Sequence, residues 1–309
     1  MPYSQFTFQG IDNYNIVIHK WVPDAAISAK AVLVIIHGMA EHGYRYNYAA
    51  EKLVSQGVIV YAPDLRGHGK TAGTPENTGL FPQTNGWFTV AGDIMGLVNQ
   101  LKQTHNQLPL FLMGHSMGSF FVRTCISMQT LPVKGIILSG TSGEGGVMVT
   151  LGKILSNIIM LFKGRNHPSG LLDKLSFGKF SDQIKNPVTK FDWLSTDTKE
   201  VQKYVDDPFC GRVFSAGFFH NLFSGITFIN KTTSIQAIPK NLSIYFFAGK
   251  LDPVGNFGKG VEKVVNSYLK AGLTQVSLKL YDGGRHEMLN EVNKDEVIKD
   301  LANWIFDQK

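Results

Sequence analysis

Cysteine is scarce in this sequence, with only Cys125 and Cys210 among 309 residues. The pair forms no CxxC motif and lacks the cysteine and histidine spacing of zinc sites, so we predict no metal site. A disulfide between the two cysteines stays open. Two buried thiols in a cytoplasmic protein are the favoured interpretation, because disulfides are rare in reducing compartments.

A long apolar run is also missing. The most apolar stretch, roughly residues 147–162, is interrupted by Thr150, Gly152 and Lys153. It is too short and too polar for a membrane span, which needs about 20 apolar residues. The first residues do not show a basic segment followed by an apolar one, as a signal peptide would. We therefore expect a soluble, cytoplasmic protein.

Charged residues make up only 17% of the chain, and basic residues exceed acidic ones to give a net charge of +6. The lysines and arginines are scattered, and no nucleic-acid-binding motif occurs, so we expect no nucleic-acid partner. A weak attraction to anionic membranes is compatible with this charge. The hydrophobic fraction of 43% is enough to form a sizeable core.

Short apolar segments alternate with amphipathic ones along most of the chain. We predict an antiparallel hairpin over residues 6–22, followed by buried strands that alternate with helices. The further strands are expected at 31–36, 58–61, 110–113, 135–138, 242–247 and 275–280. The helices are expected at 46–56, 90–104, 118–128, 260–270 and 294–306. Repeated strand–helix units predict an α/β fold with a mostly parallel, eight-stranded sheet that has helices on both faces.

The alternation stops between residues 142 and 235. A compact domain rarely contains a structureless loop of that length, and the segment has helical patterns of its own. We therefore predict an inserted helical cap over 142–235. The remaining residues, 1–141 and 236–309, are expected to form the core.

The pentapeptide Gly114-His115-Ser116-Met117-Gly118 follows an expected strand and begins an expected helix. In a G-x-S-x-G elbow, the small residues allow a sharp strand-to-helix turn that exposes the serine hydroxyl at the carboxyl end of the sheet. The pentapeptide alone is a weak signal, but this setting is the one that the mechanism requires. We predict that Ser116 is the nucleophile of a serine hydrolase.

A serine hydroxyl needs a base to take its proton, and histidine is the usual one. In hydrolases with this elbow, the acid and then the histidine follow the serine along the chain. Three histidines follow Ser116, of which His167 and His220 fall in the expected cap. His286 follows the last expected strand, and we predict it to be the base.

The acid of such a triad orients the imidazole and stabilises its cation. Asp252 follows the strand expected at 242–247, so its side chain is expected at the same edge of the sheet as the base. Asp282 and Glu287 are closer to His286 in the sequence and are the alternatives. They lack this topological support, so we predict Asp252.

His37, Gly38 and Met39 follow the strand expected at 31–36. In this arrangement, one oxyanion donor is the amide after the nucleophile, and the other comes from a loop after an early strand. We therefore predict an oxyanion hole formed by the backbone amides of Met117 and Met39. Each donor is expected to stabilise the transition state by about 3 kcal/mol.

Five segments of the chain form a set. Residues 37–46 are HGMAEHGYRY and residues 64–69 are DLRGHG, followed by Lys70 and Thr71. Residues 114–118 are GHSMG, residues 250–254 are KLDPV and residues 284–287 are GRHE. This set resembles the HGxxEHxxRY, D-x-R-G-H-G-x-S and G-H-S-M-G segments, the acid loop and the histidine loop of monoacylglycerol lipases and related bacterial lysophospholipases. The expected cap matches no motif of that family.

The resemblance implies an α/β-hydrolase fold with a helical cap, and a triad of Ser116, Asp252 and His286 with oxyanion amides at Met39 and Met117. It also implies hydrolysis of esters of single-chain acyl lipids, monoacylglycerols or lysophospholipids, through an acyl-enzyme intermediate and without a cofactor. In monoacylglycerol lipases, the glutamate and arginine of the HGxxEHxxRY segment help to build the polar end of the pocket.

Glu41 and Arg45 are therefore candidates for substrate binding. An ion pair that holds the loop is the alternative for these two residues. Gly38 and His115, which adjoin the expected oxyanion donor and nucleophile, are further candidates.

Two apolar stripes occur in the expected cap. One recurs at helical spacing from Val147 to Phe162, and the other is rich in phenylalanine, from Phe209 to Phe223. Such stripes commonly pack one helix layer onto another. We expect a mixture of roles, in which part of these residues lines a tunnel for an acyl chain and part makes transient contact with a membrane surface.

Three other functions share the same triad: those of a small-ester esterase, a thioesterase and a serine aminopeptidase. A binding protein on a hydrolase scaffold is the alternative outside the enzymes, because a fold does not by itself establish a function. Such proteins usually lack a member of the triad, whereas all three positions are filled here.

Overall fold

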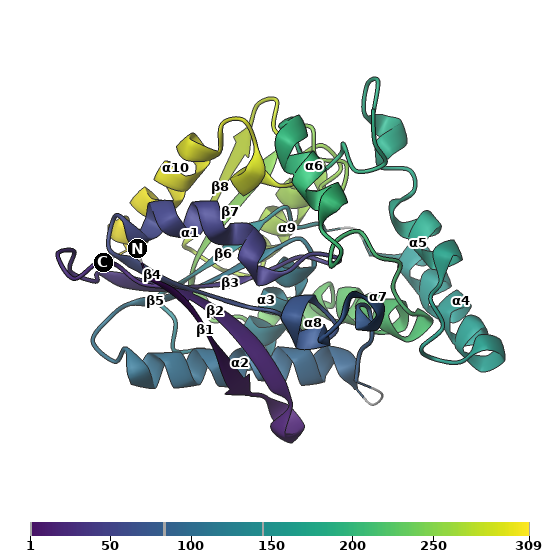
Figure 1. Ribbon diagram of the computed structural model, residues 1–309, viewed down its shortest axis with the longest axis horizontal. Helices are drawn as coiled ribbons and strands as arrows, with labels where there is room; N and C mark the ends of the chain where they lie inside the picture. Colours follow the sequence, from purple (N-terminus) through teal and green to yellow (C-terminus); the bar gives the residue numbers. More distant parts are fainter. Residues whose placement is uncertain (1, 83–84, 144, 309) are drawn as a thin grey trace.

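The computed structural model describes residues 2–82, 85–143 and 145–308. Met1, Gln83, Thr84 and Lys309 of the expected core and Glu144 of the expected cap lie outside these residues. An eight-stranded sheet forms the centre of the molecule, in the order β1-β2-β4-β3-β5-β6-β7-β8 (Figure 1). The strands are β1 (Tyr3–Gln9), β2 (Asn15–Trp21), β3 (Ala31–Ile36), β4 (Val58–Pro63), β5 (Leu110–His115), β6 (Gly135–Ser139), β7 (Ser243–Gly249) and β8 (Val276–Tyr281).

Strand β2 pairs antiparallel with β1 and with β4, whereas all other neighbours are parallel. The predicted hairpin and the predicted eight-stranded, mostly parallel sheet are therefore confirmed. The carboxyl ends of the six parallel strands lie at one edge of the sheet. Ligands of open α/β sheets bind in the crevice outside that edge.

The all-apolar sequence of β3 follows from burial on both faces of the sheet. Alternate side chains of a strand point to opposite faces. Val32, Val34 and Ile36 belong to one core, and Ala31, Leu33 and Ile35 belong to the other. A strand in this position reads as a continuous apolar run, because neither face meets water.

Helices cover both faces of the sheet (Figure 1). On one face, the buried residues of α1 (Asn47–Val54) and α10 (Lys294–Asp307) form a core with the strands. On the other face, α2 (Gly86–Thr104), α3 (Met117–Met128) and α9 (Lys259–Lys270) do the same. The molecule therefore has the three layers that the alternating pattern predicts.

Five α-helices lie between β6 and β7 in the part of the expected cap that the structure describes. They are α4 (Val147–Lys163), α5 (Gly170–Phe177), α6 (Thr198–Asp206), α7 (Ala216–Ile229) and α8 (Thr232–Gln236). Figure 1 shows α4 and α5 at the edge of the molecule far from both termini. Helix α7 packs against α2, α3 and α4. No observation tests the boundaries 142 and 235, so the division into core and cap stays a prediction.

The two apolar stripes have different environments. Phe214, Phe218 and Phe219 are completely buried in the core that contains α2 and α3. By contrast, most apolar side chains of α4 are exposed, including Leu161 and Phe162 at 81% each. Among the residues that the structure describes, no helix combines the length and apolar character needed to cross a bilayer.

Candidate active site

Ser116 lies on a sharp turn between β5 and α3. Its backbone has φ of 50° and ψ of −120°, a conformation that an L-residue adopts only at a cost of about 1 to 3 kcal/mol. The flanking glycines make the turn sterically possible. A Cβ at Gly118 would lie 2.0 Å from the carbonyl oxygen of Ile36, and one at Gly114 would lie 2.4 Å from that of Gly118. The pentapeptide thus has the geometry of a nucleophile elbow.

Asp252 and His286 form a buried pair beyond the carboxyl ends of β7 and β8. The distance from His286 Nδ1 to Asp252 Oδ2 is 2.9 Å, and the amide of Val254 donates to Asp252 Oδ1 over 2.9 Å. The carboxylate therefore orients the ring with a proton on Nδ1 and leaves Nε2 as the basic nitrogen. Ser116 and His286 line the same cavity.

Two opposing effects set the basicity of His286. Burial alone would lower its pKa, because an imidazolium cation loses hydration there. The charge and hydrogen bond of Asp252, together with the carboxylates of Glu287 and Glu41, outweigh burial and raise the pKa above 6.5. The arrangement stabilises the cation that a general base becomes when it accepts a proton.

The alternative acids have other partners. Asp282 is 88% exposed and pairs with Lys250 over 2.7 Å. Glu287 is buried and pairs with Arg45. Among the described residues, the carboxylate that contacts His286 Nδ1 is that of Asp252.

The loop after β3 is held by a buried histidine. The amide of Leu65 donates to His37 Nε2 over 2.9 Å, so the Nδ1–H of His37 donates to the carbonyl oxygen of Gly38 over 2.7 Å. Burial lowers the pKa of His37 to about 4, which keeps the ring neutral. Because the C=O and N–H of a trans peptide point in opposite directions, this bond directs the Met39 amide away from His37.

The two expected oxyanion donors flank the nucleophile. Gly38 and Met39 line the cavity together with Ser116. Met117 is the first residue of α3, and the first amides of a helix have no acceptor within it. The Gly38 amide is already bound, because it donates to Glu41 Oε1 over 2.5 Å. The geometry is compatible with Met39 and Met117 as donors, and their role stays a prediction.

Glu41, Arg45 and Glu287 form a buried ion network. Arg45 donates to Glu287 Oε1 and Oε2 over 2.5 and 2.7 Å and to Glu41 Oε2 over 3.0 Å. Since Glu41 also holds the Gly38 amide, the network connects the oxyanion loop to the residue after His286. Arg45 is not among the described residues that line the cavity. The geometry favours the loop-holding ion pair over substrate binding for Arg45, whereas Glu41 does line the cavity.

His115 lines the cavity beside His286. Its ring centroid lies 4.7 Å from that of His286, and its Nδ1 lies 3.2 Å from Ser139 Oγ. Burial, followed by the nearby charge of His286, lowers the pKa of His115 to about 4. The side chain is therefore a neutral polar group in the cavity, and its part in substrate binding stays a prediction.

A segment that the sequence analysis did not identify packs onto the histidine loop, residues 282–287. The Trp193 ring centroid lies 5.2 Å from that of His286. The backbone of this segment accepts hydrogen bonds from the loop: the carbonyl of Leu194 accepts from the Glu287 amide over 2.7 Å, and that of Trp193 accepts from the His286 amide over 3.4 Å. The sequence offers one signal that could have drawn attention to Trp193, because the chain has only four tryptophans.

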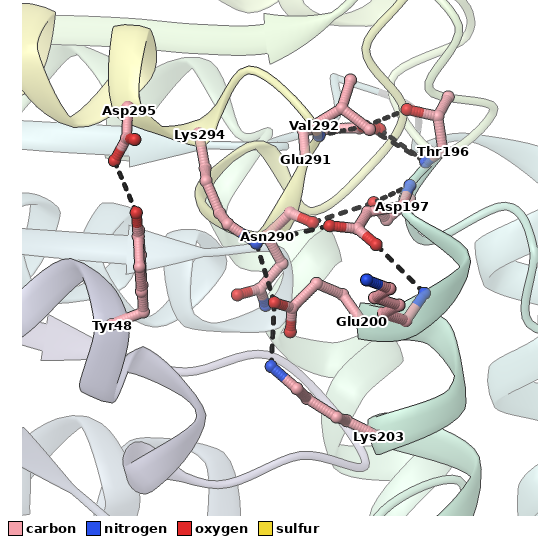
Figure 2. Close-up of polar contacts among 12 residues, drawn as sticks. Tyr48, Thr196, Asp197, Glu200, Lys203, Asn290, Glu291, Val292, Lys294 and Asp295 are labelled. Atoms are coloured by element: carbon pink, nitrogen blue, oxygen red, sulfur yellow. Dashed lines mark hydrogen bonds and ion pairs between the residues drawn. The ribbon is translucent and has the colours of Figure 1, made fainter.

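Buried Glu291 fixes this segment in place. Its carboxylate accepts from the Arg285 amide over 2.7 Å and from the Thr196 amide over 3.0 Å. Nearby, Lys294 reaches Glu200 of α6 over 2.8 Å. Figure 2 shows the contacts of Glu291 with Thr196 and of Lys294 with Glu200, which join the start of α10 and the residues before it to the start of α6. They hold Trp193 against His286.

The cavity has apolar and polar walls. The apolar side chains that line it include Met39, Phe177, Phe191, Trp193 and Leu194. Besides the polar residues described above, Asp173, Ser181, Lys190 and Arg212 line it. Among the described lining residues, none belongs to α4 or α7. The prediction that part of the two apolar stripes lines the tunnel is wrong for this cavity, since α7 is buried in the core and α4 lies outside.

Comparison with known proteins defines the family. The model of a family described as serine aminopeptidase, S33, matches residues 27–293. The chain belongs to this family. It is 27% identical to the monoacylglycerol lipase of Mycolicibacterium smegmatis over 98% of this chain and 96% of that protein. It is 25% identical to a monoglyceride lipase homolog of monkeypox virus over 96% of each chain.

Solved structures agree with this membership. A highly thermostable carboxyl esterase from Bacillus coagulans, crystallised with glycerol, matches 100% of this chain and 99% of its own, with a TM-score of 0.89 and 29% identity. The resemblance to monoacylglycerol lipases and the α/β-hydrolase fold are confirmed. The chain is a carboxylic ester hydrolase.

Proposed function

We propose that this enzyme hydrolyses monoacylglycerols, with Ser116 as nucleophile, His286 as general base and Asp252 as the acid that orients it. The observation that carries the proposal is the buried Asp252–His286 pair at 2.9 Å, beside a serine on a strained elbow in the same cavity. Relatives that are similar over almost their whole length are named monoacylglycerol or monoglyceride lipases.

The proposed reaction has two steps. Ser116 Oγ attacks the acyl carbonyl while His286 Nε2 takes its proton, and the oxyanion accepts hydrogen bonds from the amides of Met39 and Met117. Collapse of the intermediate breaks the ester bond, and the glycerol oxygen leaves with the proton from His286. Water then attacks the acyl-enzyme with His286 again as base, which releases the fatty acid and restores Ser116.

The lining of the cavity is suited to a substrate with a polar and an apolar end. Glu41 and His115 line the cavity together with Ser116, so in the proposed complex they would face the hydroxyl groups of the glycerol. Phe177 and Phe191 provide apolar surface for an acyl chain. Binding sites of this kind are mostly apolar with a few polar groups that fix orientation.

A panel of substrates tests this assignment. It compares a monoacylglycerol, a lysophosphatidylcholine, a short p-nitrophenyl ester, an acyl thioester and an aminoacyl arylamide. We expect the highest kcat/KM for the monoacylglycerol and loss of every activity in Ser116→Ala. A preference for the arylamide would contradict the lipid assignment and favour a serine aminopeptidase. A preference for the lysophospholipid would keep the assignment to single-chain acyl lipids and change only the assigned headgroup.

The same proposal includes a transient contact between α4 and a membrane surface. Seven apolar side chains of this helix are exposed: Val147, Met148, Leu151, Ile154, Ile158, Leu161 and Phe162. The helix contains Lys153 and Lys163 and no acidic residue. Exposed apolar side chains with interspersed basic ones are typical of helices that lie in a membrane interface. Such a contact would bring the cavity close to its lipid substrate.

Vesicle sedimentation tests this contact. We expect the wild type to bind vesicles of phosphatidylcholine with phosphatidylglycerol, and the double variant Leu161→Ser, Phe162→Ser to bind at least about tenfold more weakly, because two large apolar groups no longer enter the lipid. Val292→Ser is the matched control, since Val292 is 71% exposed and lies outside α4. Equal binding of the wild type and the double variant would contradict a contact through α4.

The proposal keeps two further predictions from the sequence. Residues 142–235 act as a cap over the core, because this segment supplies Trp193 and most of the apolar wall of the cavity. A cytoplasmic location is compatible with Cys125 and Cys210, which are both free and buried.

A further inference from the structure

His42, Asp207 and Cys210 come together outside the catalytic cavity. One potential ligand atom from each side chain, an imidazole nitrogen, a carboxylate oxygen and a thiol sulfur, lies within 4.8 Å of the others. His42 Nε2 and Asp207 Oδ2 are 2.9 Å apart. Neither a CxxC motif nor a histidine pair marks this cluster in the sequence, because 165 residues separate His42 from Asp207.

We propose that His42, Asp207 and Cys210 bind a divalent cation of the zinc class, with a water molecule as the fourth ligand. Three protein ligands and one open position are a common coordination of zinc, at distances of about 2.0 to 2.3 Å. Ligand atoms of such a tetrahedron are about 3.3 to 3.8 Å apart. The three side chains therefore reach this geometry by small shifts. The inference is independent of the proposed substrate.

The backbone holds the ligands in place. The amide of Phe209 donates to Asp207 Oδ1 over 2.9 Å, which leaves Oδ2 directed at His42. The Cys210 amide donates to the carbonyl oxygen of Asp207 over 3.0 Å, so both ligands belong to one tight turn. An oriented outer shell of this kind increases metal affinity, because the ligands lose little freedom on binding.

The cluster has a route to solvent. His42 and Asp207 also line a surface pocket with Tyr3, Tyr44 and Lys70. Their side chains are 12% and 28% exposed, whereas Cys210 is 6% exposed. A cation can therefore enter from the pocket and meet the buried sulfur last.

The charges around the cluster permit a cation. A cysteine binds a metal ion as a thiolate, so binding must displace the proton of Cys210 to solvent as the metal–sulfur bond forms. Arg45 is a nearby positive charge, but it is bound to both Glu41 and Glu287. That group of three has a net charge of −1 and does not repel a cation. A thiolate and an imidazole favour Zn²⁺, Co²⁺ or Cd²⁺ over Mg²⁺ and Ca²⁺.

Such a site would join two parts of the catalytic cavity. His42 lies three residues after Met39, and the Gly211 amide donates to the carbonyl oxygen of Ala40 over 3.0 Å. A bound cation would therefore connect the oxyanion loop to the turn after α6. We expect it to raise the Tm.

Titration of untagged, metal-free protein with Co²⁺ tests the proposal. We expect one Co²⁺ ion to bind per chain. The complex should show a near-ultraviolet thiolate-to-cobalt charge-transfer band and the intense visible spectrum of a four-coordinate ion. An equimolar amount of Zn²⁺ should abolish both spectral features. Calorimetry in buffers of different ionisation enthalpy should show about one proton released per ion. Mg²⁺ and Ca²⁺ should give no saturable heat. The absence of saturable binding by the wild type would overturn the proposal.

Single variants assign the ligands. We expect Cys210→Ser, His42→Gln and Asp207→Asn each to weaken Zn²⁺ binding by roughly 100-fold or more, and Cys210→Ser to remove the charge-transfer band. Cys125→Ala is the matched control, because it removes the other buried thiol. This variant should keep both the affinity for Zn²⁺ and the charge-transfer band. Metal-free thermal unfolding shows which variants fold. If Cys210→Ser does not fold, the partly exposed His42→Gln decides. Unchanged affinity in a folded ligand variant would show that the ion binds elsewhere.

Discussion

The ion pair between Arg45 and Glu287 gives a quantitative prediction about stability. The side chains are 8% and 6% exposed, and two hydrogen bonds of 2.5 and 2.7 Å join them. Burial alone would raise the pKa of Glu287, but the charge and hydrogen bonds of Arg45 outweigh it and lower the pKa from 4.5 to about 2. This difference corresponds to about 3 kcal/mol of folding stability at neutral pH.

The sign of the pH dependence follows from the direction of that shift. Above pH 4.5, Glu287 is ionised in the folded and the unfolded chain, and its contribution to stability is complete. As the pH falls from about 4.5 toward 2, the unfolded chain binds a proton that the folded one does not, so the contribution is lost. Glu287→Gln removes the charge at every pH. We therefore expect this variant to be about 3 kcal/mol less stable at pH 7, and the difference to be clearly smaller at pH 3.5.

Urea unfolding at these two pH values measures both effects. Asp282→Asn is the matched control in the same loop, because Asp282 is 88% exposed and its pair with Lys250 should contribute less than about 1 kcal/mol. Glu287→Gln as stable as the wild type at pH 7 would refute the reasoning. A loss of stability that is the same at pH 3.5 as at pH 7 would show that packing, and not charge, causes it.

Three further predictions concern catalysis. Asp252→Asn should lower kcat by roughly 10³ to 10⁴, because the amide favours the wrong tautomer of His286; a tenfold loss or less in folded protein would contradict the assigned acid. The pKa of His286 is raised above 6.5, and the base must be neutral to accept a proton. We therefore expect kcat/KM to fall as the pH falls through this raised pKa; a profile that stays flat to pH 5 would exclude His286 as the base. His37→Ala should lower kcat by roughly 100-fold with little change in KM, because the Gly38 carbonyl and hence the Met39 amide lose their anchor; a change in KM alone would contradict this role.

The elements that depend on neighbouring residues were predictable from the sequence. Buried strands such as β3 show uninterrupted apolar runs, and the elbow at Ser116 has its glycines next to it. The start of α2 was predicted incorrectly: it was expected at Val90 and lies at Gly86. Asn221 of α7 accepts a hydrogen bond from the Trp87 amide over 3.0 Å, so a residue distant in the sequence stabilises that end of the helix.

The same distinction applies to the site. The order and strand-end positions of Ser116, Asp252 and His286 predicted that these residues lie together, because topology alone brings them to one edge of the sheet. Glu287, one of the two ion-pair partners of Arg45, is 242 residues away, and no local sequence pattern indicates this contact. Trp193 contacts His286 from a segment with no recognisable motif. Contacts of this kind depend on how the segment from 142 to 235 packs onto the sheet.

Labelling with a fluorophosphonate is the most direct test of the central claim that Ser116 is the activated nucleophile. Intact mass and peptide mapping would follow the reaction in wild type and in Ser116→Ala, with thermal unfolding to show that both are folded. We predict one adduct per wild-type chain, on the peptide that contains Ser116, and none on the variant. A wild type that does not react, or a variant that reacts equally well, would contradict the account.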